Sequence, residues 1–165
     1  MHAIVAVDEN WGIGCENRLL FTIPEDMKYF KDFTLNKIVV MGNVTFFSLP
    51  NSKPLPNRTN IVLSKDANLK IEGAIVCNSV EQLLEVIKDY DPDDVIIIGG
   101  QMIYELMLPY CKTALVTKVK SLKKADKFFP NLDLKENWRV KSISEEKNHH
   151  DLKYAFYIYE NKDRV

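Results

Sequence analysis

The stretch Val95–Leu108, VIIIGGQMIYELML, joins a wholly apolar run, two glycines and a helical segment in direct succession. Four consecutive β-branched residues at Val95–Ile98 are typical of a strand that is buried on both faces. The residues from Gln101 to Leu108 are expected to form a helix that Pro109 closes. A buried strand followed directly by a helix is the repeating unit of an α/β fold with a parallel sheet.

The remainder of the chain repeats this alternation. Apolar runs predict further strands at His2–Val7, Lys37–Met41, Thr59–Leu63, Ala74–Cys77 and Leu115–Val119. Helices are predicted from about Pro24, at Val44–Leu49 and at Ser79–Asp89, and a loop at Asn51–Asn57. Polar and apolar residues alternate in two C-terminal segments, Trp138–Ile143 and Tyr154–Tyr159, as in an antiparallel pair. We therefore expect a mainly parallel sheet with helices on both faces and an antiparallel C-terminal edge.

The composition is that of an ordinary globular protein, and 165 residues suit one domain. The net charge of −1 gives no general attraction to nucleic acid or to an anionic membrane. No apolar run approaches the roughly 18 residues of a membrane span, and the run before Asp8 is too short for a signal peptide. Five lysines between Lys118 and Lys127 have no aromatic residues among them, which indicates a solvated loop.

The cysteines and histidines show no metal-ligand spacing. Cys15, Cys77 and Cys111 are odd in number and widely separated, which favours reduced thiols and a cytoplasmic protein. His149 and His150 adjoin each other in a polar segment, without a cluster of further ligands. We expect no metal site.

The segment that begins at about Pro24 places an acid among apolar residues. Thr22 and Glu25 have the spacing of a capping box, which predicts a helix start there. Asp26 then shares a helix face with Phe30 and Phe33, at i+4 and i+7, and Met27 lies beside them. Burial would raise the pKa of such a carboxyl, and the group could bind a polar ligand and assist proton transfer. The alternative is that Asp26 only complements the positive end of the helix dipole.

Three predicted strands end in residues that suit an anion. Gly99-Gly100 would let a phosphate approach the backbone at a helix start, although tight packing of strand against helix explains two glycines equally well. Gly42 precedes a second such turn, and Ser64-Lys65 ends a third strand with a hydroxyl and a cation. The carboxyl ends of parallel strands share one edge of a sheet, so a ligand with several phosphates would suit all three turns. Arg58 is either an exposed residue or a bidentate partner for a carboxylate.

In order and spacing, these segments resemble dihydrofolate reductase over nearly the whole chain. The matching segments are AVDENWGIG, IPEDMKYFK, TLNKIVVMG followed by Thr45, PLPNRTNIVLS, IIIGGQMIYE, LVTKV, ADKFFP and YAFYIYE. The resemblance implies a single α/β domain at residues 1–165, with a mainly parallel eight-stranded sheet and about four flanking helices. It also implies the reduction of 7,8-dihydrofolate with NADPH for one-carbon metabolism. A monomer is expected because the sequence has no obvious exposed apolar stripe that would need a partner. Diaminopyrimidine or pteridine antifolates are expected ligands.

The resemblance assigns a role to individual residues of the substrate site. It makes Asp26 the acid that holds the pterin, supported by Thr117, and Arg58 the partner of the glutamate α-carboxylate, with Lys53 as a looser second basic contact. The residues expected to wall the pocket are Val5, Met27, Phe30, Leu49, Leu55 and Ile98.

The resemblance also assigns the cofactor site. Residues expected near the nicotinamide are Ala6, Ile13, Gly14 and Leu19. Residues expected at the phosphates and riboses are Val44, Thr45, Gly99, Gly100, Gln101, Met102, Ile103 and Tyr104. Residues expected at the adenosine end are Leu63, Ser64, Lys65 and Asn78. The segment from Glu9 to Phe21 corresponds to a mobile lid, in keeping with its two glycines.

Three positions depart from the family pattern. Leu19-Leu20-Phe21 replaces the usual Leu-Pro-Trp, which removes an indole N–H that helps to order an active-site water. Asn43 replaces a basic residue near the cofactor phosphates, and Gln101 stands where some members have a third glycine. The first two departures concern catalytic efficiency and cofactor preference.

Two other functions remain open at this point. A related pteridine or pyrimidine reductase would use the same scaffold, but it has no need for Arg58 as a clamp on a folate tail. A homologue that binds folate or nucleotide without turnover is the non-enzymatic alternative. The joint presence of Asp26, Thr117 and Gly99-Gly100 argues against it.

Overall fold

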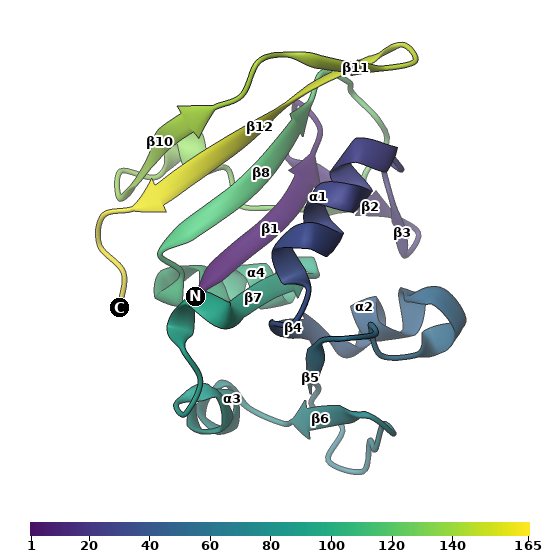
Figure 1. Ribbon diagram of the computed structural model, residues 1–165, viewed down its shortest axis with the longest axis vertical. Coiled ribbons are helices and arrows are strands. Elements are labelled where there is room, and N and C mark those ends of the chain that lie inside the picture. Colours follow the sequence, from purple (N-terminus) through teal and green to yellow (C-terminus); the bar gives the residue numbers. More distant parts are fainter.

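A computed structural model describes all 165 residues and contains one large sheet (Figure 1). Its strands lie in the order β10-β12-β8-β1-β7-β4-β5-β6. Their bounds are β1 His2–Val7, β4 Ile38–Gly42, β5 Thr59–Leu63, β6 Ala74–Cys77, β7 Val95–Gly99, β8 Thr113–Val119, β10 Trp138–Ile143 and β12 Leu152–Asn161. The pairs from β8 through β1, β7, β4 and β5 to β6 are parallel. The pairs that β12 makes with β8 and β10 are antiparallel, which confirms the predicted architecture.

Four helices cover the two faces of this sheet. Their bounds are α1 Pro24–Thr34, α2 Asn43–Ser48, α3 Val80–Ile87 and α4 Gln101–Met107. Short 3-10 turns occur at Pro50–Ser52, Pro92–Asp94, Leu108–Tyr110 and Leu132–Leu134. Ser79 caps α3 as predicted, because its side chain accepts a hydrogen bond from the amide of Gln82. None of the four helices has the length and apolar character needed to cross a membrane.

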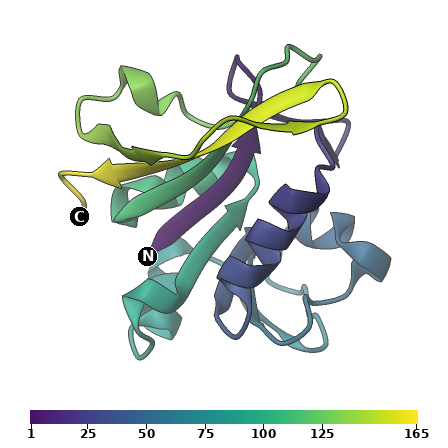
Figure 2. The same cartoon turned by 45° about the horizontal axis from the view of Figure 1, so that its top comes forward.

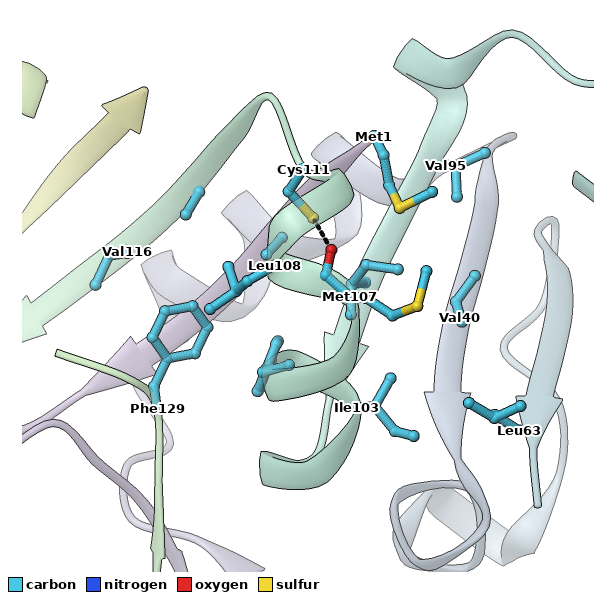
Figure 3. Close-up of a cluster of buried hydrophobic side chains, with 14 of the residues drawn as sticks. Met1, Val40, Leu63, Val95, Ile103, Met107, Leu108, Cys111, Val116 and Phe129 are labelled. Carbon is cyan, nitrogen blue, oxygen red and sulfur yellow. Dashed lines mark hydrogen bonds between the residues drawn. The ribbon is translucent and has the colours of Figure 1, made fainter. Parts of the chain in front are cut away.

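Alternation along the strands divides the core between the two faces. Val40 and Ile97 belong to the larger cluster, which includes residues of α3 and α4. Figure 3 shows part of this cluster, with Met107 and Ile103 of α4 facing strand residues. The Cys111 thiol donates a hydrogen bond to the carbonyl of Met107. On the opposite face, one small cluster receives Phe46 of α2, and another lies under the aromatic residues of α1. Figure 2 shows α1 running along this second face.

The sequence did not predict a second sheet and a hairpin that the structure contains. Three short strands form the second sheet, in the order β3-β2-β9: β2 Gly12–Cys15, β3 Arg18–Leu19 and β9 Lys127–Phe128. The hairpin is completed by β11, Lys147–His149, which pairs with β12. These strands have two to four residues each, too few for a pattern of alternation to be recognised.

The interpretation of the lysine-rich segment as a solvated loop is wrong at both ends. Lys118 belongs to β8, forms an ion pair with Asp133 at 3.0 Å, and lies over the ring of Trp11 at 4.8 Å. Lys127 belongs to β9. The aromatic partners of Lys118 come from distant segments, which a search for neighbouring aromatic residues in the sequence could not detect.

Candidate active site

Asp26 lies in the first turn of α1 and is joined to the strand beneath it. The hydroxyl of Thr117, in β8, donates a hydrogen bond of 2.6 Å to Asp26 Oδ1. Burial raises the pKa of the Asp26 carboxyl, and the hydrogen bond from Thr117 opposes part of that rise. Burial raises the pKa of the Tyr29, Tyr104 and Tyr154 phenols, and the charge of Asp26 adds a smaller contribution in the same direction. The site therefore holds an acid with an elevated pKa in a largely uncharged surrounding, as its position in the sequence predicted.

The predicted capping box at the start of α1 is wrong. The N-cap is Ile23, no side chain caps the helix, and Pro24 occupies the first turn. Glu25 does not reach back to Thr22. Its carboxylate instead accepts a hydrogen bond from Tyr154 and pairs with Lys147, both from the far end of the chain. The Glu25 carboxylate therefore binds residues that are distant in the sequence, although its local spacing predicted a role in capping the helix.

The apolar residues of α1 divide between core and surface. Phe30 and Phe33 pack on the cluster formed by Ile4, Ile96 and Leu115, as their spacing with Asp26 predicted. Met27 is 55% exposed, so the expectation that it packs toward the core is wrong. An exposed methionine beside Asp26 is available to a ligand instead.

The other residues expected in the substrate pocket do not all lie on one side of the sheet: Ile98, Leu49 and Leu55 pack on the face that α1 and α2 cover, whereas Val5 packs against the larger cluster on the opposite face. Val5 and Ile98 are partly buried in β1 and β7. Leu49 and Leu55 follow α2 and pack against the Phe46 cluster. Lys53 is exposed and forms no ion pair.

Arg58 is held in place by two hydrogen bonds within the chain. Its Nε donates to the carbonyl of Pro56 at 2.9 Å, and its Nη1 donates to Thr34 Oγ1 at 3.1 Å. Burial lowers the pKa of the guanidinium, although arginine stays charged at neutral pH. Arg58 has no carboxylate partner within the chain, so its charge is available to an anionic ligand.

Two supporting residues of this region escaped the sequence analysis. Thr34 ends α1, donates its hydroxyl to the carbonyl of Phe30 and accepts from Arg58. Asn60 bonds to both the amide and the carbonyl of Leu55, which fixes the loop before Arg58. Thr34 lies two turns beyond Asp26 at helical spacing, so the sequence contained a signal for its position, whereas the Asn60 contacts depend on the loop fold.

Gly99 and Gly100 allow the end of β7 to approach neighbouring elements closely. Gly99 has a φ of +119°, and a Cβ there would lie 3.1 Å from the ring of Tyr104. A Cβ on Gly100 would lie 3.3 Å from the hydroxyl of Thr45. The Gly99–Gly100 peptide bond is cis. Both glycines are thus packed tightly against neighbouring side chains, and this packing brings the starts of α2 and α4 together.

The side chains expected at the cofactor phosphates are not equally accessible. Val44 and Met102 are exposed, whereas Ile103 and Tyr104 are buried. Tyr104 donates its hydroxyl to the carbonyl of Ile4 at 2.7 Å, and its amide bonds to Gly100, so it packs within the fold. The Gln101 side chain accepts from the amide of Phe128. Neither α2 nor α4 has a side-chain cap, which leaves the amides of their first turns without such a partner.

The turn after β5 is braced by Asn78. The Asn78 side-chain amide donates to the carbonyls of Ser64 and Asp66 at 2.9 and 3.1 Å. Leu63 is buried behind this turn, while Lys65 is exposed and forms no ion pair. One free cation therefore stands at the end of β5.

The residues expected near the nicotinamide lie in β1 and in the small sheet. Ala6 is half-buried in β1, and Ile13 and Gly14 are buried in β2. Leu19, in β3, is 82% exposed. Asp126 ties this segment to the sheet, because its amide donates to the Gly14 carbonyl and its carboxylate accepts from the Glu16 amide. The prediction of mobility for Glu9–Phe21 stays a prediction.

Comparison with known proteins agrees with this arrangement. A family model described as dihydrofolate reductase matches residues 1–161. The dihydrofolate reductase of Bacillus subtilis (strain 168) is 34% identical over 164 residues, which cover 97% of this chain and 94% of the relative. That of Neisseria meningitidis serogroup B is 36% identical over 157 residues, 94% of each chain.

A solved structure gives the same result in three dimensions. It is a dihydrofolate reductase from Enterococcus faecalis complexed with NADP(H) and RAB-propyl. The two structures superpose with a TM-score of 0.87 at 31% identity, over 98% of this chain and 96% of the relative. The match of the family model to nearly the whole chain, with full-length relatives at 34% and 36% identity, shows that the chain belongs to the dihydrofolate reductase family.

Proposed function

We propose that Asp26 and Thr117 bind and activate the pterin in the NADPH-dependent reduction of dihydrofolate that this chain, as a dihydrofolate reductase, carries out. The observation that carries the proposal is the 2.6 Å hydrogen bond from Thr117 to Asp26, at a position where burial raises the pKa of the carboxyl. Perturbed acids of this kind cluster at functional sites. The product is 5,6,7,8-tetrahydrofolate.

Asp26 and Arg58 are spaced to hold the two ends of a folate. Arg58 bonds to Thr34, and residues 26 and 34 are separated by about 12 Å along a helix. Asp26 would accept hydrogen bonds from the amino group and ring N–H of the pterin. Arg58 would bind the α-carboxylate of the glutamate tail, with Lys53 as a second cation and the apolar residues between them covering the middle of the ligand.

These residues can promote protonation of the pterin ring. A carboxylate paired with the amino edge favours protonation of the ring nitrogen beside the carbon that is reduced. Asp26 bonded to that edge does not reach this nitrogen, so water delivers the proton. Thr117 fixes the orientation of the carboxylate throughout. When bound, NADPH supplies the hydride.

The residues at the sheet edge fit a dinucleotide cofactor. Close packing at Gly99 and Gly100 brings two helix starts together, and their uncapped first-turn amides are suitable donors for phosphate oxygens. Lys65, free of any ion pair, stands beside Ser64 as a partner for a ribose 2′-phosphate. These residues would hold the phosphates of NADPH, while Ala6, Ile13 and Leu19 would contact its nicotinamide end.

The preference for NADPH over NADH tests this assignment. Because Asn43 replaces a usual cation, we expect NADPH to be preferred less strongly than in relatives with a basic residue there. Lys65→Ala should erode the preference further, and Asn43→Arg should strengthen NADPH binding with little change for NADH. Exposed phosphate contacts are screened by salt, so both effects should shrink as ionic strength rises.

Dissociation constants of both cofactors for each variant decide the matter. Lys70→Ala is a matched control, because Lys70 is an exposed lysine of the same region that also forms no ion pair. If Lys65→Ala left the NADPH-to-NADH ratio unchanged, the 2′-phosphate would have to bind elsewhere.

A single assay tests the proposed function as a whole. Purified protein with NADPH and dihydrofolate should show loss of the nicotinamide absorbance, and a pterin without the glutamate tail should react poorly. Comparable rates with both substrates would indicate a pteridine reductase. Binding of both ligands without an absorbance change would indicate a protein without turnover. A diaminopyrimidine inhibitor should suppress the reaction by pairing with Asp26.

A further inference from the structure

The first turn of α1 has no cap of its own, yet it must keep Asp26 in place. Its N-cap residue is Ile23, which offers no side-chain hydrogen bond to the helix amides. An uncapped helix start is less stable than a capped one by about 1 kcal/mol, and end turns fray readily. Asp26 lies within this turn, so something outside the helix has to fix it.

The neighbouring residue Glu25 supplies that fixation. Its Oε2 accepts a hydrogen bond of 2.9 Å from the hydroxyl of Tyr154, and its Oε1 lies 2.9 Å from Lys147 Nζ. Tyr154 is 2% exposed and the Lys147 side chain 25% exposed. Exposed ion pairs contribute little, but a pair anchored by a buried phenol is more rigid. Both contacts lower the pKa of Glu25, so the carboxylate is ionised when it makes them.

Strand β12 aligns these contacts with the Asp26–Thr117 bond. Tyr154 and Phe156 are two residues apart in β12, so their side chains point to the same face of the sheet. Phe156 stacks on Tyr29 of α1 at 4.3 Å, and it pairs in register with Thr117 of β8. The surface that presents Thr117 to Asp26 therefore also presents Tyr154 to Glu25. In Figure 1 the β11–β12 hairpin lies by the end of α1 at which the helix begins.

We propose that Glu25, Tyr154 and Lys147 are positioning residues, which clamp the first turn of α1 to the β11–β12 hairpin and thereby hold Asp26 against Thr117. The inference rests on the proposed role of Asp26. None of the three residues touches the reacting atoms, so they act on catalysis only through the placement of that carboxylate. Small misplacements of a catalytic group reduce rates strongly, by about 100-fold for 1 Å.

Graded variants test the clamp. Glu25→Ala removes both contacts, and we expect roughly a tenfold loss of kcat with a raised KM for dihydrofolate and an unchanged dissociation constant for NADPH. Glu25→Gln keeps an acceptor for Tyr154 and should retain more activity than Glu25→Ala. Tyr154→Phe removes only one hydroxyl, so it tests the clamp with the least risk to folding. Lys88→Met removes a surface ion pair to Glu85 on α3 and should change nothing.

A double-mutant cycle distinguishes positioning from a general loss of stability. If Glu25 acts through Asp26, then adding Glu25→Ala to Asp26→Asn should not reduce the residual activity further. Losses that multiply, or a lower melting temperature with unchanged kcat and KM in both Glu25→Ala and Tyr154→Phe, would overturn the clamp. The catalytic assignment stands or falls separately, because it depends on the activity of Asp26→Asn alone.

Discussion

Replacing Asp26 by Asn should lower turnover near pH 7 by at least ~100-fold, the low end for a general acid–base contribution. Asparagine keeps the shape and can still accept the hydrogen bond from Thr117. It loses the negative charge that, in the proposed function, pairs with the pterin and favours protonation of its ring nitrogen. Activity should recover in part at low pH, where protonated dihydrofolate is more abundant.

The measurement is the pH profile of kcat for the native chain and for Asp26→Asn. Asp32→Asn is a matched control on the same helix, since Asp32 is exposed and pairs only with Lys28. Its turnover should equal that of the native chain. Native turnover at pH 7 in Asp26→Asn would remove the carboxylate from the mechanism.

The stability of the same variant shows whether lost activity reflects unfolding. Burial raises the pKa of Asp26 in the folded chain, so the folded state binds this proton more tightly than the unfolded state. The stabilisation linked to protonation is complete below the unfolded pKa and is lost as pH rises through the raised folded pKa. Asparagine is uncharged at every pH, so the variant does not lose this stabilisation as pH rises. Asp26→Asn should therefore melt a few degrees higher at pH 7, an advantage that disappears below about pH 4. A slower but more stable variant would locate the defect in chemistry.

The regular part of the fold could be predicted because its signals are local. The apolar runs of β5 and β6, with the bounds Thr59–Leu63 and Ala74–Cys77, are where the sequence indicates them, as is the Ser79 cap. Burial on both faces requires a run of apolar residues, and such a run has few other structures available to it. The acid at Asp26 was predictable for the same reason, since helical spacing placed it beside Phe30.

The contacts that the sequence could not give are those made between distant segments. Glu25 had the spacing of a capping box, but Tyr154 and Lys147 offered stronger partners once the C-terminal hairpin was folded against α1. Lys118 had no aromatic neighbours in the sequence, yet it lies over the ring of Trp11. Tertiary contacts override a local capping preference worth about 1 kcal/mol. A short sequence motif therefore shows that a local structure is possible, but it does not show that this structure forms.

The substrate assignment depends on Arg58, and Arg58→Leu should weaken dihydrofolate binding by roughly 2–5 kcal/mol, about 30-fold or more in dissociation constant. The guanidinium is partly desolvated and is oriented by Thr34 and by the carbonyl of Pro56, so it is ready to bind a carboxylate without reorganisation. Leucine keeps the bulk of the side chain and removes the charge. NADPH binding should be unchanged.

A pterin without the glutamate tail separates binding from folding. It cannot reach Arg58, so its dissociation constant should be nearly the same for Arg58→Leu and for the native chain. Arg139→Leu is the matched control, because Arg139 is an exposed arginine of β10 that pairs with Glu160 on β12. Thr34→Val should reproduce a smaller part of the Arg58→Leu defect, since it removes only the hydroxyl that orients the guanidinium. Equal losses for dihydrofolate and for the truncated pterin would show that Arg58 supports the loop rather than the folate tail.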